Sequence, residues 1–535
     1  MTEAQKKIIK SSAFSFLGVY LNFFLGLLST FSIARIITPE EWGLLLIAES
    51  FVATGAFLCS LFPPGAEGSI EYYIPHLKGL GGNRDIEIRE FILHNYRLRS
   101  LSGLIGFFVY LIVIFSANIE LTLLQLTLIL SPKILLSLIQ NLNIAIITAF
   151  QKFKFLFIVM SIHVFNISIG NFSILLINPL NSILIVAIVN LLGLTITMAI
   201  SFFYILKIIP KKRKISQSEV NHKKNFYKLH KTYGLPLVFT GLIAQMGNLA
   251  SNLIFLAFGF VQYITYLSIC ETIITSTLKF SSSDRTVQMT IFSEINYDKN
   301  PENYKKTFYQ YFKYLSLIVC IFTAIFYYFI DVYIDIIYSE VYSIVLLIIP
   351  IYIFQTFSRL INRNLLVLVY STNHTKISIY YSIIQTVNNL IVTCISLAFF
   401  NFTTLIIFYL ATSYLLNILT ILLIRKIVGF KINILKLIYP FLIYTVSFFI
   451  TIPFTYFINV QLFSLIILND VSNSLVHFLI FLIPFYILIY MTKFITREEF
   501  SQLMIIMPGK RFRNRFIQKI IENLTKLFPS QKVIS

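Results

Sequence analysis

The sequence predicts an all-α polytopic membrane protein with about fourteen transmembrane helices, on three observations. First, 57% of the 535 residues are hydrophobic and only 12% are charged, and the mean hydropathy is +0.80. No soluble core can hide that much apolar surface, whereas spans of about 20 residues in a bilayer can. Second, the apolar residues form runs of span length separated by short polar segments. Third, the positive charges alternate with these runs in the manner that orients membrane proteins.

Apolar runs bounded by Gly, Pro or charged residues mark the individual helices. The expected spans are residues 11–37, 43–64, 98–117, 120–150, 155–177, 181–206, 236–258, 262–280, 311–330, 341–370, 377–399, 403–424, 437–458 and 475–493. The first run follows Lys6, Lys7 and Lys10 and has no small-residue cleavage site. We therefore expect a retained first helix rather than a cleaved leader.

The charge distribution predicts a multi-pass protein of the cell membrane with both termini in the cytoplasm. All but four of the 43 Lys and Arg residues lie in segments that are inside if the N-terminus is inside. These expected inner segments are residues 1–10, 65–99, 151–154, 207–231, 279–313, 371–376, 425–436 and 493–535. Cytoplasmic segments carry such an excess of positive residues, and one missed helix would invert the alternation downstream.

Residues 207–231 contain nine Lys and Arg against one acid, and they separate two membrane halves. A shift of 222 residues lays Ala-Glu-Ser at 48–50 on Cys-Glu-Thr at 270–272. Both halves then contain six helices with the same orientation, which predicts a parallel repeat that encloses a cleft between two lobes. The expected parts are an N-terminal lobe (1–206), a basic cytoplasmic linker (207–232), a C-terminal lobe (233–428), two additional helices (429–495) and a basic amphipathic tail on the inner leaflet (496–535).

Composition and motifs argue against several classes of function. The net charge of +20 does not indicate nucleic-acid binding, because the positive residues are confined to segments between spans. The sequence has no Gly-x-x-x-x-Gly-Lys-Ser/Thr motif for a built-in ATPase, and its four Cys residues are too scattered for a metal site. The longest expected outer turn, 459–474, is too short for a catalytic domain. We therefore expect a protein that is not an enzyme and uses no metal or cofactor.

Several predicted helices carry a polar stripe at a spacing of three to four residues, a face that lipid does not tolerate. Such a stripe indicates either hydrogen bonds between helices or the wall of a wet cavity, and the sequence leaves both interpretations open. The residues predicted to line a cavity are Asn22, Asn141, Gln245, Asn248, Asn252, Gln385 and Asn389.

Lys133, Arg359 and Arg363 lie well inside predicted spans. Each costs roughly 2.5 to 3.5 kcal/mol at a helix centre, so each needs water, an anion or a partner. Arg359 and Arg363 share one helix face and present two planar donor forks, which suit a phosphate or pyrophosphate. Alternatively, Arg363 reaches the cytoplasmic interface and Arg359 pairs with an acid. Arg35, at the outer end of the first helix, is either an interfacial anchor or a substrate ligand.

Glu49 and Glu271 are the only acids in the interior of the predicted spans, since Glu120 is an end residue, and the 222-residue shift makes their positions equivalent. An unpaired carboxylate in lipid prefers its protonated form. The two residues are expected either to pair with Arg or Lys, or to form a proton or sodium site that couples substrate movement to an ion gradient.

The end of the first predicted helix reads Ile-Ala-Arg-Ile-Ile-Thr-Pro-Glu-Glu-Trp-Gly over residues 33–43. This sequence resembles the Ala-Arg-x-Leu-Gly-Pro-x-x-Tyr-Gly signature of polysaccharide-biosynthesis flippases, the Wzx-like members of the MOP exporter superfamily. Arg35, Pro39 and Gly43 match the signature. The second half is similar too, with Tyr-Gly-Leu-Pro opening the seventh helix and Tyr266 in the eighth, although Asn252 stands where many relatives have an acid.

The resemblance and the intramembrane charges together favour a flippase. It would take an anionic lipid-linked oligosaccharide of the polyprenyl-diphosphate type from the inner to the outer leaflet by alternating access. Its partners would be the lipid-linked glycan, membrane lipids, and cytosolic or membrane glycan-assembly enzymes. An ion-coupled multidrug exporter of the same superfamily stays open as an alternative, although intramembrane positive charges repel cationic substrates. A membrane-embedded polysaccharide polymerase or glycosyltransferase is a third alternative, but it would usually need a large outer loop.

Overall fold

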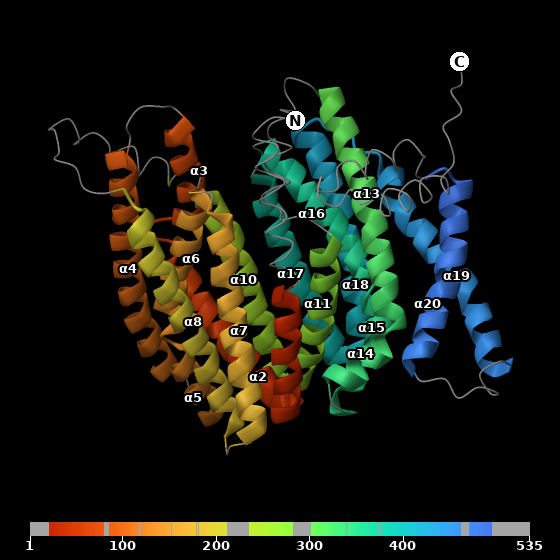
Figure 1. Cartoon of the computed structure of the whole chain (residues 1–535), viewed down its shortest axis with the longest axis horizontal. Coiled ribbons are helices and arrows are strands. Elements are labelled where there is room, and N and C mark those ends of the chain that lie inside the picture. The colour runs from red at the N-terminus through yellow and green to blue at the C-terminus, as the bar shows by residue number, and fades with distance from the viewer. Residues whose placement is uncertain are drawn as a thin grey trace, which may run out of the picture.

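The computed structural model shows a bundle of helices (Figure 1). The residues it describes are 21–79, 85–116, 119–150, 152–177, 179, 181–210, 230, 235–281, 301–338, 340–372, 374, 376–461 and 470–494. Within these ranges the regular structure is helical and no strand occurs, so the predicted all-α class is confirmed.

The described helices follow one another along the chain in two sets, one in each half. In the first half the order is Leu21–Ile36, α2 (Pro39–Cys59), α3 (Ala66–Gly79), α4 (Asp85–Ser116), α5 (Leu121–Leu130), α6 (Lys133–Ala149), α7 (Phe153–Ile177) and α8 (Ser182–Ile208). In the second half the order is α10 (Leu235–Ala257), α11 (Val261–Ser281), α13 (Pro301–Tyr328), α14 (Ile330–Ile337), the 3-10 helix η3 (Glu340–Tyr342), α15 (Ile344–Tyr352), α16 (Gln355–Ser371), α17 (Lys376–Phe399), α18 (Phe402–Ile427), α19 (Ile434–Gln461) and α20 (Asp470–Met491). Figure 1 shows α4 to α8 on one side of the bundle, and α19 and α20 at the opposite edge beyond α13.

With α5 and α6 counted together as Leu121–Ala149, eleven helices among the described residues are long and apolar enough to cross a membrane. The number is twelve when α15 and α16 are counted as one broken span bent by 46°. The helix Leu21–Ile36 is a shorter apolar helix, and α11 is not among the eleven. Each of the fourteen expected spans overlaps a described helix. The multi-pass membrane class is therefore confirmed, whereas the count of fourteen and the cytoplasmic position of the termini stay predictions.

Part of an expected inner connection is helical and packed. The segment 65–99 contains α3 and the start of α4, which begins at Asp85 rather than near residue 98. The α3 helix buries Ile70 and Ile74 in a cluster with apolar residues of α4 and α6. Arg99 on α4 is fully buried and paired with Glu67 on α3 at 2.6 Å between Nη2 and Oε2. Hydropathy alone misses these helical segments because they contain charged residues, which lower the mean hydropathy. In the fold, Arg99 and Glu67 compensate each other's charge.

The bounds of the helices follow the shift of 222 residues. The α2 and α11 helices both begin and end 222 residues apart. The turn at residues 131–132, between α5 and α6, lies 222 residues before the turn at 353–354, between α15 and α16. This correspondence is what a parallel repeat requires, and it supports the predicted two-lobe organisation.

Both of these mid-span turns are associated with a proline. Pro132 directly precedes the first residue of α6, and Pro350 lies within α15. Proline donates no backbone hydrogen bond and its ring clashes with the preceding turn, so a helix is interrupted or bent there. Lys133 and Arg359 follow these two turns within the same broken spans.

The α2 helix packs against α10 and α11, so it is where the two halves meet. Pro39 opens α2, and a capping box fixes its start: the Thr38 N–H donates to Glu41 Oε2 at 2.8 Å, and the Glu41 N–H donates to Thr38 Oγ1 at 3.3 Å. Contact with α11 is close, because a Cβ on Gly43 would lie 2.5 Å from the carbonyl oxygen of Val261. The motif 38–43 therefore sets both the direction of α2 and its approach to the other half.

The last two helices attach to the second half through aromatic rings. Phe357 on α16 stacks on Phe441 of α19 with ring centroids 4.6 Å apart. Tyr444 on α19 lies 5.3 Å from the ring of Phe481 on α20. Such contacts add specific geometry to apolar burial, so α19 and α20 extend the second half without reaching the cavity described next.

Candidate functional site

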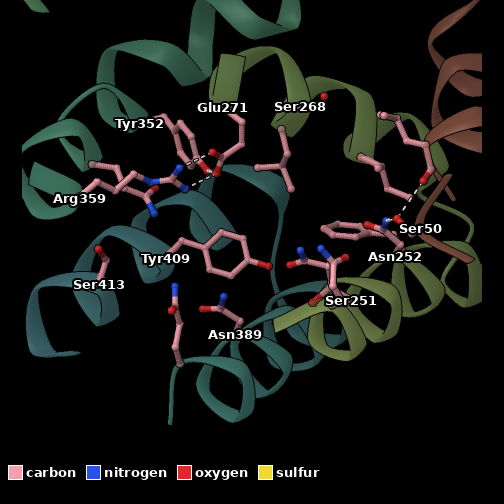
Figure 2. Close-up of a pocket in the computed structure, with 18 of the residues that line it drawn as sticks. Ser50, Ser251, Asn252, Ser268, Glu271, Tyr352, Arg359, Asn389, Tyr409 and Ser413 are labelled. Carbon is pink, nitrogen blue, oxygen red and sulfur yellow. Dashed lines mark hydrogen bonds and ion pairs between the residues drawn. The ribbon is translucent and has the colours of Figure 1, made fainter. Parts of the chain in front are cut away.

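A polar cavity of about 700 Å³ lies where the two halves meet (Figure 2). Its walls come from α2 on one side and from α10, α11, α15, α16, α17 and α18 on the others. Carboxylates, a guanidinium, amides and hydroxyls from these helices face the space. The volume lies in the range of sites that bind small ligands and head groups.

Most of the predicted site residues line this cavity. The lining includes Glu49, Gln245, Asn248, Asn252, Glu271, Arg359, Gln385 and Asn389. The amides come from the polar stripes of α10 and α17, two helices that pack against each other, so these stripes face a cavity. Outside the lining lie Asn22, Arg35, Lys133, Asn141 and Arg363.

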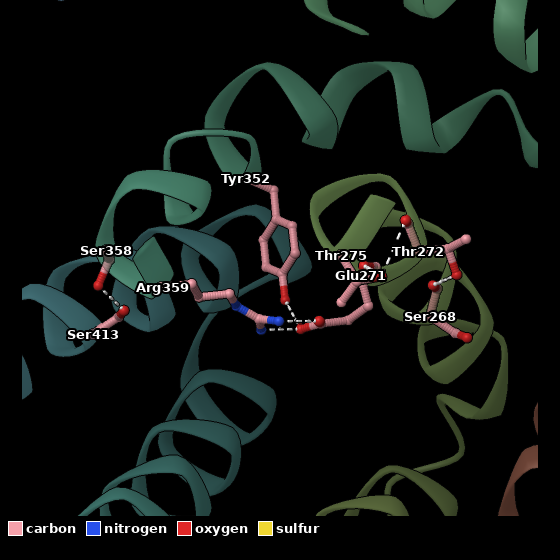
Figure 3. Close-up of polar contacts among 8 residues, drawn as sticks. All are labelled: Ser268, Glu271, Thr272, Thr275, Tyr352, Ser358, Arg359 and Ser413. Atoms are coloured by element: carbon pink, nitrogen blue, oxygen red, sulfur yellow. Dashed lines mark hydrogen bonds and ion pairs between the residues drawn. The ribbon is translucent and has the colours of Figure 1, made fainter. Parts of the chain in front are cut away.

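Arg359 and Glu271 form a two-pronged ion pair in the cavity wall (Figure 3). Nη1 and Nη2 of Arg359 each donate to a different carboxylate oxygen of Glu271. Tyr352 Oη also donates to Glu271 Oε1, at 2.6 Å. The Arg359 and Glu271 side chains are 31% and 35% exposed, so the pair remains open to the cavity. Three helices, α11, α15 and α16, thus meet at one carboxylate.

A second ion pair joins Lys133 to Glu49. Lys133 is the first residue of α6, and its Nζ lies 2.9 Å from Oε1 of Glu49 on α2. Glu49 lines the cavity, whereas Lys133 does not. The two halves therefore carry equivalent ion pairs. The acid lies on the second span of each half, as Glu49 or Glu271, and the cation follows the turn in the fourth span, as Lys133 or Arg359.

The charge of the cavity differs from the expectation of an excess of positive side chains. Its lining in the described residues carries one positive side chain, Arg359, and two carboxylates, Glu49 and Glu271. Both carboxylates are paired, Glu49 with Lys133. The physical reason is that an uncompensated charge at this depth is costly, so the conformation seen here compensates each one. Pairing with Arg or Lys is one of the two alternatives that the sequence left open for these acids.

Sequence reasoning missed the tyrosines of the cavity. Tyr352, Tyr381 and Tyr409 line it, and the chain has 31 Tyr residues with no motif that singles these out. Tyr381 alone had a usable signal, because it lies four residues before Gln385 on the same helical face.

One hydrogen bond in the cavity wall crosses between the two halves. Asn252 Nδ2 on α10 donates to Ser50 Oγ on α2 at 2.7 Å (Figure 2). Asn252 therefore joins the two halves by a hydrogen bond. It occupies the position where the resemblance would place an acid.

Arg35 lies outside the cavity, where it joins the two halves. Its Nη1 and Nη2 donate to the carbonyl oxygens of Ile337 and Ile336, at 2.9 and 3.0 Å. These carbonyls end α14, where backbone acceptors lack intrahelical partners and the helix dipole is negative. The guanidinium also lies 3.8 Å from the ring centroid of Phe31. Arg35 thus caps a helix of the opposite half.

Further contacts join the halves beside Arg35. Tyr342 Oη donates to the Ile37 carbonyl at 3.1 Å, and Thr265 Oγ1 donates to the Pro39 carbonyl at 2.7 Å. The ring of Trp42 stacks on Tyr338 at 6.4 Å and meets Tyr342 edge-on at 5.9 Å. We call this set the latch; it comprises Arg35, Ile37, Pro39, Trp42, Thr265, Ile336, Ile337, Tyr338 and Tyr342. The latch joins the halves at the end of the bundle that the sequence predicts to be outer.

Comparison with known proteins identifies the fold. No family model and no curated protein matches the chain. Among solved structures, lipid II flippase MurJ in an inward closed conformation has a TM-score of 0.60 at 19% identity, covering 90% of this chain and 99% of that chain. A MOP superfamily transporter from Pyrococcus furiosus, described by the reverse polarity of its binding pocket, has a TM-score of 0.58 at 12% identity, covering 79% and 96%. An inward-facing multidrug resistance MATE transporter has a TM-score of 0.56 at 12% identity, covering 76% and 94%.

The chain has the fold of MOP superfamily transporters. This agrees with the resemblance in residues 33–43, and the three solved structures that share the fold are described as a flippase and as transporters. Within this MOP fold, the cavity with Arg359 and Glu271 lies between the two halves, and the latch lies to one side of it. Among the described residues, no group of three or more His, Cys, Asp or Glu side chains could hold a metal ion.

Proposed function

We propose that the protein is a flippase that carries an anionic lipid-linked oligosaccharide from the inner to the outer leaflet. The observation that carries this proposal is the guanidinium of Arg359, which faces a polar cavity of about 700 Å³ at the middle of the bundle. A guanidinium offers parallel donors that match the oxygens of a phosphate, and it keeps its charge. The diphosphate that links lipid and glycan in such substrates would bind there.

The amide walls suit the glycan part of this substrate. Gln245 and Asn248 on α10 face the same space as Gln385 and Asn389 on α17. Each amide offers both donors and acceptors, which complement sugar hydroxyls. The apolar carrier chain would stay in the bilayer, since only the head group is costly to bring across hydrocarbon.

Transport by alternating access requires the latch to break. The contacts of Arg35, Thr265 and Tyr342 join the halves on one side of the cavity. They are few and largely directed at backbone carbonyls, so water can replace them when the halves separate. We propose that substrate enters from the opposite, cytoplasmic side and leaves after the latch has opened.

Fold coverage favours the flippase over the alternative in the same superfamily. The MurJ structure, which is of a lipid II flippase, covers 90% of this chain, whereas the MATE structure covers 76%. One observation favours a multidrug exporter as a second candidate: the lining contains two carboxylates, Glu49 and Glu271, which attract cations. An exporter would lower the drug sensitivity of cells and leave glycan assembly unchanged.

The test is an Arg359→Ala variant in cells that depend on this protein for surface glycan. We expect surface glycan to be lost and lipid-linked glycan to accumulate on the inner leaflet. Arg359→Lys should restore export only partly, because lysine keeps the charge without the planar fork. Glycan-assembly enzymes would still act in these cells, so the substrate should be complete when it accumulates.

A double variant separates substrate binding from a purely structural role. Arg359→Ala alone leaves Glu271 uncompensated, which lowers stability whether or not Arg359 binds substrate. Arg359→Gln combined with Glu271→Gln removes both charges and should restore the protein level. Normal glycan export by this double variant would overturn the proposed role, whereas a stable protein without export supports it. Loss of drug resistance with intact glycan export would favour the exporter.

A further inference from the structure

We propose that Glu271 is a resident anion in the phosphate site, and that a bound diphosphate displaces it from Arg359 and leaves it protonated. An anion and a proton would then enter the cavity together. This inference rests on the proposed function and adds to it a link between substrate binding and proton uptake.

The first step of the argument is competition for the same donors. Both terminal nitrogens of Arg359 donate to Glu271, so the fork that suits a phosphate is occupied in the conformation seen here. A phosphate that binds with the same two parallel hydrogen bonds must take the place of the carboxylate. The ion pair is therefore the ground state that any anionic substrate has to displace.

The second step is access. The Arg359 and Glu271 side chains are each about one-third exposed, at 31% and 35%, and both line the cavity (Figure 3). A ligand can thus reach the guanidinium without unfolding a helix. Tyr352, at 3% exposed, donates to Glu271, so the carboxyl group keeps one hydrogen-bond partner after it has left Arg359.

The third step is the fate of the carboxylate. Of the helices packed against α11, α16 supplies Arg359, α15 supplies the neutral Tyr352, and α2 supplies Glu49 to the lining. The lining residues of α10 carry no titratable side chain, and α13 contributes none to the cavity. Beyond them, α17 and α18 supply only the phenols of Tyr381 and Tyr409 to the lining.

No described side chain in this lining can therefore replace Arg359 as a counterion. Lys133 is held by Glu49, and the incoming diphosphate brings further negative charge. A carboxylate without a counterion in the membrane interior becomes neutral by binding a proton, here taken from solvent.

The experiment counts protons during anion binding by the purified full-length protein in lipid nanodiscs. The probe is UDP-glucose, a soluble diphosphate diester whose own charge is constant near neutral pH. Calorimetric titrations in two buffers with different ionisation enthalpies give the number of protons taken up for each bound molecule. We expect uptake approaching one proton, affinity that increases as the pH falls, and no dependence on sodium.

Variants assign the proton to its site. Glu271→Gln removes the competing charge, so it should bind the probe roughly tenfold more tightly and without proton uptake. Glu120→Gln, which changes an exposed acid outside the cavity, is the matched control and should behave as the wild type. Arg359→Gln should abolish binding.

The outcomes separate the inference from the function on which it rests. Binding by the wild type without proton uptake would overturn the exchange and leave the phosphate site intact, and this result does not depend on how well any variant folds. Weaker binding by Glu271→Gln, or proton uptake retained in that variant, would also overturn it. Equal binding by the wild type and Arg359→Gln would instead contradict the proposed function itself.

Discussion

Replacing Gly43 by alanine should open the latch without touching the cavity. A Cβ at this position would lie 2.5 Å from the Val261 carbonyl oxygen and 2.6 Å from Val261 Cγ1. The first of these atoms belongs to the backbone of α11 and cannot rotate away. The α2 and α11 helices must therefore separate at the end where Trp42 contacts Tyr338 and Tyr342.

The magnitude follows from the cost of overpacking. An extra methyl group forced into a well-packed contact costs about 1 to 3 kcal/mol. If that cost applies only while the halves touch, the ratio of closed to open latch should fall by about 5- to 140-fold. Gly26→Ala is the matched control, because no atom lies within 4 Å of a Cβ at Gly26, and alanine is the better helix former.

The assay uses the protein's own fluorescence. Trp42 is the only tryptophan in the chain, and it lies in the latch against two tyrosine rings. Quenching of its emission by acrylamide should increase in Gly43→Ala and stay unchanged in Gly26→Ala. A folded Gly43→Ala protein with wild-type quenching would refute the reasoning, because the latch would then tolerate the added methyl group.

Three further predictions concern the side of the bundle that the sequence predicts to be cytoplasmic. Arg99→Ala should lower the free energy of unfolding by about 3 kcal/mol, because it removes a fully buried partner of Glu67; thermal unfolding beside the exposed Arg97→Ala control tests this. Burial between Ser69 and Phe91 lowers the pKa of His230 to about 4, below its ordinary value of about 6.5. The unfolded chain therefore binds this proton first as the pH falls from about 6.5 to 4, so the free energy of unfolding should decrease there by up to about 3 kcal/mol; an unchanged slope in His230→Gln would contradict this. A reporter fused after residue 535 should be active only in the cytoplasm, and activity only outside would invalidate the predicted orientation.

Hydropathy and charge predicted the spans well because a helix that crosses lipid needs about 20 predominantly apolar residues. The alternation of apolar runs located a helix for each expected span, from Leu21–Ile36 to α20. The same reasoning missed α3 and the start of α4, since these lie where charged residues interrupt the runs. Arg99 was counted as an inner-surface charge, whereas it is fully buried on α4 and paired with Glu67 of α3.

The sequence predicted which helix faces line the candidate site, but it did not predict which residues of other helices these side chains contact. Spacing placed Gln245, Asn248 and Asn252 on one face of α10, and that face lines the cavity. Spacing carries no information on which neighbouring helix a side chain meets. Arg35 shows the consequence, since its partners are the carbonyls of Ile336 and Ile337, about 300 residues away in sequence. Backbone acceptors carry no sequence signal at all.

The pairing of charges could still have been inferred from energy. A bare cation at a helix centre costs roughly 2.5 to 3.5 kcal/mol, and Glu49 and Glu271 are the only acids in the interior of the predicted spans. They were thus the available partners for Lys133 and Arg359, as the structure shows. The same reasoning limits the substrate. A ligand that separates Arg359 from Glu271 must bind the guanidinium about as strongly as the carboxylate does. A neutral sugar or a cationic drug offers Arg359 no such interaction, whereas a diphosphate does, so we expect the pair to open only for an anion.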